Sequence, residues 1–355
     1  MIKKFIFILA VLISAQSFSQ RSTSSPYSYF GVGEEFGTRT VEQISMGSIG
    51  AAYSSPSYLN FINPASLSEL RLATYVFGVL NNDLTISDAD VNQSTNSTSL
   101  SYFSIAFPLS KKMAVVFGMQ PTSSVGYSLI NTLNDDEGNF EEITQYVGSG
   151  DVNRIYGGFG LKLFKGFSVG LELDFLFGNI QNNVLNIRDE VTLATKNVED
   201  SNVRGGSIKL GAQYKTTLTK DINLHVGASF KLGNSLSSTG TENLYSLSLG
   251  ASGFEQPRDT IFSGPLTANL ERPLETILGL GLGKTNKWYA GINYKTQDAL
   301  VASGYFDNSA ESFQYGQSNR ISAGGFYIPK INSISSYWQR VTYRGGVKFE
   351  KLGLL

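Results

Sequence analysis

The chain has 355 residues, with 28 basic and 29 acidic side chains and no cysteine. The near-neutral charge offers no basic surface for nucleic acid, and the missing cysteine excludes disulfides, thiolate metal sites and a lipid-modified N-terminal cysteine. Charged residues make up only 16% and glycines number 37, whereas soluble domains average roughly 25% charged residues and 7% glycine. This composition favours a β-rich wall that faces lipid.

Residues 1–19 have the features of a secretory signal peptide. Lys3 and Lys4 precede an apolar run at 5–13, and Ser17 and Ser19 have the small-residue spacing of a cleavage site. The run is too short for a transmembrane helix, which takes about 20 residues. No helix-length apolar segment follows, so an integral membrane protein would have to be a closed barrel. We therefore expect export and an outer-membrane location, with membrane lipids as neighbours.

Residues 20–70 differ in character from the rest and contain SPYSYFGVGE, ISMGSIGAAYSS and FINPASLSEL. Small residues permit close backbone packing, and Asn63 followed by Pro64 predicts a short helical turn over 63–70. An apolar, compact segment ahead of a barrel is a candidate hatch or plug. Its candidate residues are Met46, Gly47, Gly50, Asn63, Pro64 and Ala65.

From residue 72 onward the chain alternates between apolar and polar residues, which predicts antiparallel strands. Eleven strands are expected, at 72–82, 100–109, 112–120, 154–164, 167–187, 203–218, 222–235, 273–284, 287–297, 320–329 and 341–351. The 154–164 strand reaches the roughly 9–11 residues that a tilted strand needs to cross hydrocarbon. The sequence therefore predicts an all-β fold, a transmembrane antiparallel β-barrel over 71–355.

One parity of these strands supplies a lipid face, and the other supplies an inner face with charges of both signs. The lipid face is expected to carry Phe103, Ile105, Phe107, Ile208, Leu210, Ala212, Tyr214, Leu278, Leu280, Leu282, Trp288, Ala290, Ile292 and Tyr294. The candidates for the lumen are Lys162, Glu172, Asp174, Lys209, His225 and Arg344. Buried charges must be paired or solvated, so a structural role for them is at least as well founded as a functional one.

Short and long connections alternate along the predicted barrel. Tight turns stand near 110–111, 165–166, 219–221 and 285–286, while long polar loops are expected at 83–98, 121–153, 188–202, 236–272 and 298–319. Short periplasmic turns and long surface loops are typical of outer-membrane barrels, whereas a secreted β-sandwich remains the alternative. Barrels of this class have an even number of strands, so either a strand near 244–249 was missed or the last hairpins are absent; we favour truncation.

Three catalytic or binding motifs are weak matches. Gly166 to Gly170 reads G-x-S-x-G, but the alternation continues through Ser168 where an esterase needs a helix, and His225 is the only histidine. GLGLGKT has three residues, not four, between its outer glycines. Residues 88–92 open like a calcium loop but lack its glycine and glutamate. We expect no enzyme, no catalytic residue, no cofactor and no resident metal.

The region from Met46 to Ala52 and the run Asn63-Pro64-Ala65-Ser66-Leu67 resemble the N-terminal signature of the FadL family of outer-membrane transport proteins. RISAGGFYIP and YRGGVKFE resemble that family's late strands, and SFSQ with SPYSYFGVGE is similar to exported proteins of Bacteroidetes. The resemblance implies a barrel of about fourteen strands with an N-terminal hatch, which admits hydrophobic compounds such as long-chain fatty acids. Similar barrels in that lineage serve as subunits of secretion or assembly machines. Two functions therefore stay open: transport of hydrophobic compounds, and a non-transporting subunit that binds other outer-membrane proteins.

Overall fold

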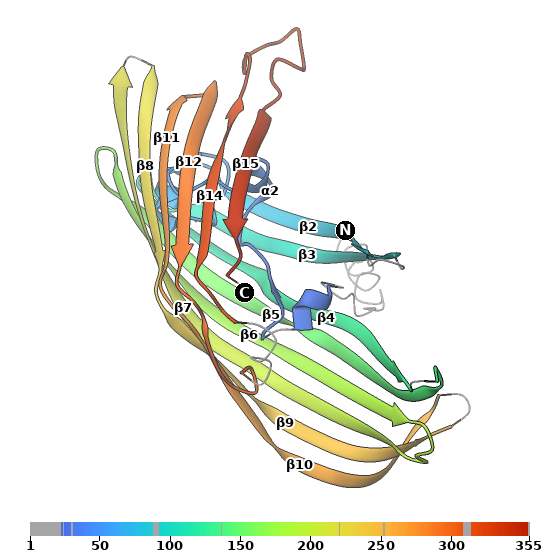
Figure 1. Cartoon of the computed structure of the whole chain (residues 1–355). Coiled ribbons are helices and arrows are strands. Elements are labelled where there is room, and N and C mark those ends of the chain that lie inside the picture. The colour runs from blue at the N-terminus through green and yellow to red at the C-terminus, as the bar shows by residue number, and fades with distance from the viewer. Residues whose placement is uncertain are drawn as a thin grey trace, which may run out of the picture.

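The computed structural model describes residues 23, 25–29, 31–87, 92–135, 137–219, 221–250, 253–307 and 314–353. The predicted signal peptide and Asp88 to Val91 of the calcium-like stretch lie outside them. The described part is almost entirely antiparallel sheet, curved around a short N-terminal segment (Figure 1). Among the described residues, no helix has the length and hydropathy needed to cross a membrane.

Eleven strands form the main path of the sheet, in the order β15-β14-β12-β11-β8-β7-β6-β5-β4-β3-β2. They are β2 (Thr74–Ser87), β3 (Asn92–Pro108), β4 (Met113–Asn134), β5 (Phe140–Phe164), β6 (Phe167–Arg188), β7 (Ala194–Thr219), β8 (Ile222–Lys231), β11 (Glu275–Lys284), β12 (Trp288–Gln297), β14 (Ser318–Tyr327) and β15 (Tyr343–Lys351). Each corresponds to one of the eleven predicted strands. The predicted antiparallel all-β fold is confirmed.

The sheet divides at β7, because the two halves of this strand pair with two different strands along the same edge. Its last half pairs with β8, from Lys209 onward, while its first half, Ala194 to Gly205, pairs with β9 (Asn234–Leu249). Strand β9 continues to β10 (Glu255–Arg272), and β10 pairs with β13 (Val301–Gly304). The lower part of Figure 1 shows this extension beside the long strands β4 to β7.

Four of the five predicted long loops are therefore wrong as loops, whereas only Val301–Gly304 and the start of β14 are strands in the fifth, 298–319. Most of 83–98, 121–153 and 188–202 continues the neighbouring strands as hydrogen-bonded hairpins, and most of 236–272 is β9 and β10. The suspected additional strand at 244–249 is part of β9. Apolar side chains are scattered in these stretches among serine, threonine, asparagine and glycine, so they lack the regular alternation that revealed the other strands. Main-chain hydrogen bonds pair the strands, and Val125, Tyr127, Val152, Leu236 and Leu270 pack together in one buried apolar cluster.

The outer face of the main path carries a broad apolar belt. Most of the side chains predicted for the lipid face are exposed: Phe103, Phe107, Ile208, Leu210, Tyr214, Leu278, Leu280, Leu282, Ile292 and Tyr294. Ala290 is exposed as well, and Ile105, Ala212 and Trp288 are half-buried. Closely spaced exposed apolar side chains of this kind are unusual in a soluble protein. The alternation therefore sorts the side chains by face as predicted.

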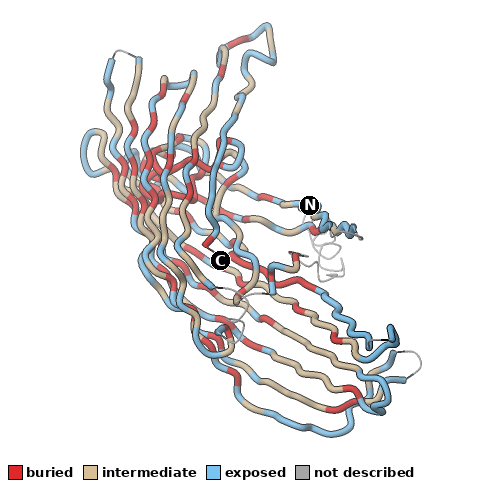
Figure 2. The backbone as a smooth tube through the Cα atoms, in the orientation of Figure 1, coloured by how far each residue is buried: buried red, intermediate tan, exposed pale blue. Residues whose placement is uncertain are grey.

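The N-terminal segment, which comprises residues 31–70, lies against the inner face of the sheet. It contains β1 (Glu34–Glu35), the helical turn α2 (Val41–Ile44) and the 3₁₀ helix η2 (Pro64–Glu69), and the 3₁₀ turn η1 (Pro26–Tyr29) precedes it. A capping box between Thr40 and Gln43 starts α2. Figure 2 shows buried residues gathered where this segment meets the strands. The core of the molecule is thus the junction between the segment and the wall.

Candidate functional site

The helix η2 is fixed in place by Asn63. The predicted helical turn is confirmed, with Asn63 as N-cap and Pro64 at the first helical position. The Asn63 side chain is fully buried, and its Oδ1 accepts from Ala65 N at 3.0 Å. Its Nδ2 donates to three carbonyl oxygens: Ala51 at 2.7 Å, Ala212 at 3.1 Å and Ala228 at 3.1 Å. One side chain therefore caps η2 and ties the segment to β7 and β8.

We expect Asn63→Asp to be more damaging than Asn63→Ala. Aspartate keeps the N-cap acceptor, but its carboxylate would face three carbonyl oxygens that now receive hydrogen bonds. Alanine removes a cap worth about 0.5–2 kcal/mol and leaves buried carbonyls unpaired at about 1–3 kcal/mol each. The measurement is the temperature at which the folded, heat-modifiable electrophoretic form is lost. Equal stability of the aspartate variant and wild type would show that these donor bonds are unimportant.

A set of glycines on the wall lets the backbone of the N-terminal segment approach closely. Gly160, Gly170 and Gly211 lie side by side in register on β5, β6 and β7; Gly227 and Gly279 do so on β8 and β11; and Gly324 and Gly346 do so on β14 and β15. We call these seven residues the facing glycines. Each of them faces atoms of the segment.

The approach leaves no room for side chains at the facing glycines. A Cβ at Gly227 would lie 1.9 Å from Ala51 O, one at Gly170 would lie 2.3 Å from Ala65 N, and one at Gly324 would lie 2.2 Å from Met46 O. Real Cβ atoms essentially never come this close to backbone atoms. The segment and the wall are therefore in direct backbone contact at these strands. Met46, Gly47, Gly50, Pro64 and Ala65, the hatch residues predicted with Asn63, all lie in the N-terminal segment and are buried.

A buried ionic network occupies the inner face next to the facing glycines. Arg154 is 1% exposed, and its Nη1 lies 2.8 Å from Glu172 Oε1 and 2.9 Å from Asp174 Oδ1. Lys209 Nζ lies 2.6 Å from the same Glu172 oxygen and donates to Phe61 O of the segment at 3.1 Å. Gln120 Oε1 accepts from the Arg154 Nε at 3.0 Å. Every charge in this network has a partner, as burial requires.

The remaining predicted luminal residues also face the segment or its neighbours. Lys162 pairs with Glu69 of η2, and the Arg344 guanidinium lies 5.5 Å from the Tyr58 ring. His225 is buried edge-on to Tyr289, with ring centroids 5.4 Å apart. The structure thus joins Glu172, Asp174 and Lys209 in one network and leaves Lys162, His225 and Arg344 outside it. Arg154 and Gln120 complete the network. In the sequence, their only signal is that they occupy the alternate strand positions that face the lumen.

The hydrolase interpretation of Ser168 is contradicted. Ser168 lies inside β6, which continues to Arg188 with no helix after it. Among the described residues, no group of three or more histidine, aspartate or glutamate side chains could hold a metal ion. The arrangement of buried side chains is one of packing and ion pairing.

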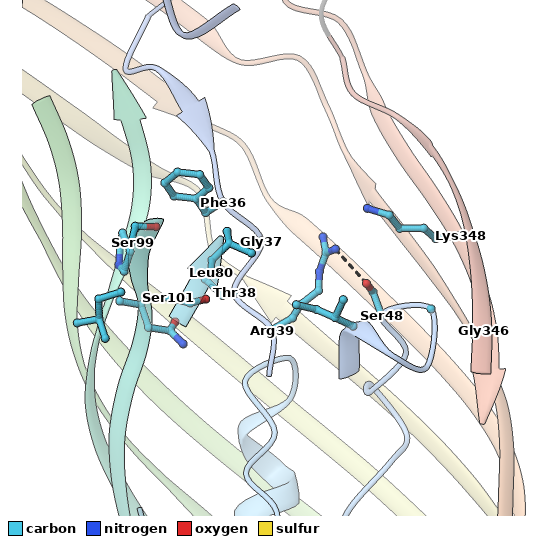
Figure 3. Close-up of a pocket in the computed structure, with 15 residues that line it drawn as sticks. Phe36, Gly37, Thr38, Arg39, Ser48, Leu80, Ser99, Ser101, Gly346 and Lys348 are labelled. Atoms are coloured by element: carbon cyan, nitrogen blue, oxygen red, sulfur yellow. Dashed lines mark hydrogen bonds between the residues drawn. The ribbon is translucent and has the colours of Figure 1, made fainter. Parts of the chain in front are cut away.

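Two cavities border the N-terminal segment. The smaller, of about 300 Å³, lies between β2 and β3 on one side and β15 on the other. Figure 3 shows Arg39 of the segment between Ser99 and Ser101 of β3 and Lys348 of β15, donating to Ser48 Oγ at 3.0 Å. Burial and the nearby Arg320 lower the pKa of Arg39 to about 10, so it stays charged at neutral pH. Val41 N donates to the Tyr102 hydroxyl of β3 at 3.2 Å and Met46 lies against Gly346 of β15, so the segment bridges the two ends of the strand path.

The larger cavity has a volume of about 600 Å³ and a mixed lining. Its apolar part includes Phe36, Phe61 and Ile277, and its cations include Lys231 and Arg272. Arg272 Nη2 pairs with Glu35 of the segment at 2.7 Å, while its buried Nε has no hydrogen-bond partner among the described residues. An ion pair from β10 thus also holds the segment.

The fold is shared with solved channel structures. The toluene transporter TodX of Pseudomonas putida matches with a TM-score of 0.53 and 17% identity over 87% of this chain and 83% of that one. The monoaromatic hydrocarbon channel CymD matches with a TM-score of 0.54 and 16% identity over 88% of this chain and 83% of that one. A FadL homologue of Pseudomonas aeruginosa matches with a TM-score of 0.56 and 12% identity over 90% of this chain and 82% of that one. The chain therefore has the FadL-type transmembrane β-barrel fold that the resemblance implied.

The family is shown by the sequence itself. The family model described as BamG matches residues 1–355, and no curated protein matches the chain significantly. The chain belongs to the BamG family.

Proposed function

We propose that the protein is an outer-membrane barrel that does not conduct solutes and serves as a structural subunit of a larger outer-membrane secretion or assembly complex. The observation that carries this proposal is the seating of the N-terminal segment on the facing glycines. Backbone-to-backbone contact leaves no passage between segment and wall at those strands. In this proposal the segment is a fixed plug.

The ionic network supports the same proposal. A path for hydrophobic compounds needs an apolar surface, because an apolar solute cannot replace the hydrogen bonds of the charged groups that it displaces. Here the Arg154–Glu172–Lys209 contacts lie on the inner wall and reach the segment through Phe61 O. Moving the segment would leave Lys209 with one partner fewer in a buried site. Such a lumen favours rigidity over passage.

The second candidate is transport of hydrophobic compounds, with long-chain fatty acids as the narrower expectation. It is favoured by the fold shared with TodX and CymD, and by the larger cavity, whose lining is partly apolar. This candidate requires the segment to move as a hatch. The two proposals therefore differ in whether the segment leaves the facing glycines during function.

Native mass spectrometry of the protein, extracted from its own membranes in mild detergent, tests the proposal. A subunit is expected to carry a stoichiometric protein partner and no bound amphiphile. A lone barrel with bound fatty acid or hydrocarbon would overturn the proposal in favour of transport. As a second readout, a strain that lacks the protein should take up fatty acids of several chain lengths at the wild-type rate.

A further inference from the structure

The connection between β14 and β15, residues 328–342, lies at the end of the barrel where the other connections are tight. Trp288 pairs with Tyr327, and Ile328 N donates to Lys287 O at 2.7 Å, which places the connection beside the β11–β12 turn. The β5–β6 turn at the same end consists of only Lys165 and Gly166. In Figure 1 the connection extends past the neighbouring strand ends, at the top of the view. It breaks the predicted alternation of short and long connections.

Internal hydrogen bonds give this connection a defined shape. Lys330 N donates to Gln339 O at 2.8 Å, Ser333 N to Lys330 O at 3.1 Å, and Arg340 N to Tyr337 O at 2.9 Å. The Tyr343 hydroxyl donates to Trp338 O at 3.1 Å. A loop that is ordered before binding loses little conformational entropy when it binds.

The ordered loop presents large apolar side chains to solvent. Ile334 is 99% exposed, Trp338 70% and Tyr337 66%. The Tyr337 and Trp338 rings are T-shaped with centroids 5.7 Å apart, and the Arg340 guanidinium lies 6.0 Å from the Tyr337 ring. Tryptophan, tyrosine and arginine are the residue types that dominate binding energy in protein interfaces. We call Ile334, Tyr337, Trp338 and Arg340 the loop patch.

The position of the loop relative to the membrane indicates whether lipid or a protein partner would cover the loop patch. Tyr327 and Tyr343 pair across β14 and β15, and both are exposed on the outer face. Aromatic residues at strand ends form the girdle that marks the membrane boundary in such barrels. The loop patch comes after Tyr327 and before Tyr343, so it lies beyond the girdle, on the aqueous side. Lipid tails therefore do not cover it.

The charge of the loop defines the partner's chemistry. Residues 328–342 contain Lys330 and Arg340 and no acidic residue. We propose that the loop patch inserts into an apolar pocket, bordered by carboxylates, on the periplasmic face of a partner subunit. This inference rests on the proposed function as a complex subunit, and it assigns the contact to one loop.

Photo-crosslinking in intact cells tests the contact. A benzophenone amino acid replaces Ile334, whose complete exposure makes the change harmless to folding, and a control replaces Lys111 on the tight β3–β4 turn at the same end. The expected result is one discrete protein adduct from position 334, formed with the partner that co-purifies stoichiometrically with the wild-type barrel, and none from position 111. Adducts with lipid alone, or none, would overturn the inference.

A loop variant then tests the energetic role of the patch. Ile334→Ser, Tyr337→Ser and Trp338→Ser together should lower partner recovery in mild detergent at least about tenfold, while the barrel keeps its heat-modifiable folded form. The matched control, Phe254→Ser with Ile261→Ser, removes exposed apolar side chains at the opposite end and should leave recovery unchanged. If the loop variant retains the partner, the loop contact is wrong but the proposed function as a complex subunit is still supported. If the wild-type protein has no stoichiometric partner, the proposed function itself is wrong.

Discussion

Gly211→Val is expected to dislodge the N-terminal segment from the barrel wall. A Cβ at Gly211 would lie 2.1 Å from Asn63 Oδ1 and 2.8 Å from Pro64 Cδ, and valine adds two methyl groups beyond it. Overpacking of a rigid core costs about 1–3 kcal/mol and occasionally more. The Asn63 side chain is held by its own hydrogen bonds and the Pro64 ring cannot rotate away. Because β7 is also paired with a strand on each side, we expect the segment to move instead of the strand. The barrel should still form, with an accessible interior.

A single engineered cysteine can report this movement, since the chain has none of its own. Ser68→Cys is suited to the purpose, because Ser68 in η2 is buried and its Oγ has no hydrogen-bond partner among the described residues. Maleimide should label this cysteine slowly in the parent protein and at least about tenfold faster with Gly211→Val. The control is Gly206→Val on the same strand, where the nearest atom to a Cβ is Asp174 O at 3.6 Å. Equal labelling of the two valine variants would contradict a seated segment.

Arg154→Met should destabilise the barrel by about 3–5 kcal/mol, which is the usual effect of removing one partner from a buried ion pair. Glu172 and Asp174 would both lose the Arg154 guanidinium, at 2.8 and 2.9 Å, and Lys209 alone would remain close to Glu172. The measurement is the urea concentration at which the folded electrophoretic form disappears in detergent.

Neutralising the orphaned carboxylates separates charge from packing. The quadruple variant Arg154→Met, Glu172→Gln, Asp174→Asn, Lys209→Met removes every charge of the network, because Lys209 would otherwise lose its partner Glu172. It should recover most of the stability lost in the single variant, since replacing a whole buried ion network is often close to neutral. Recovery would assign the cost to unpaired charge. A quadruple variant as unstable as the single one would instead assign it to lost packing against Tyr156, whose ring lies 4.3 Å from the Arg154 guanidinium.

The strands with regular apolar alternation were predictable, and those with scattered apolar residues were not. Leu278, Leu280 and Leu282 alternate with glycines, so the period of β11 is evident in the sequence. In β9, by contrast, serine, threonine and glycine are frequent, and this turn-like composition hides a strand in which Leu236 and Leu247 are fully buried. Alternation reveals a strand only where apolar residues recur at every second position.

The candidate site was predictable only in its local parts. The N-cap role of Asn63 follows from its neighbours in the chain, because capping is a local interaction. Its bonds to Ala212 and Ala228 join residues 149 and 165 positions apart, and nothing near Asn63 encodes them. Likewise, the facing glycines resemble any other strand glycine until the register places them opposite the segment. The loop at 328–342 had a visible signal in its length and aromatic residues, which the expected alternation of connections obscured.

The contacts of Met46 with the facing glycines on β14 and β15 have a consequence for how the protein folds. Met46 lies 278 residues before Gly324 and 300 residues before Gly346, so it is synthesised long before the glycines that it contacts. Contacts so distant in sequence form late, because the entropy of closing the intervening chain must be lost first. During assembly the apolar side chains of Met46 and Ile49, which pack with Tyr289 and Phe326, therefore stay exposed to water until β12 and β14 are in place. Exposed apolar side chains make a folding chain prone to aggregation, so this part of the N-terminal segment is vulnerable for longer than hairpins that pair locally.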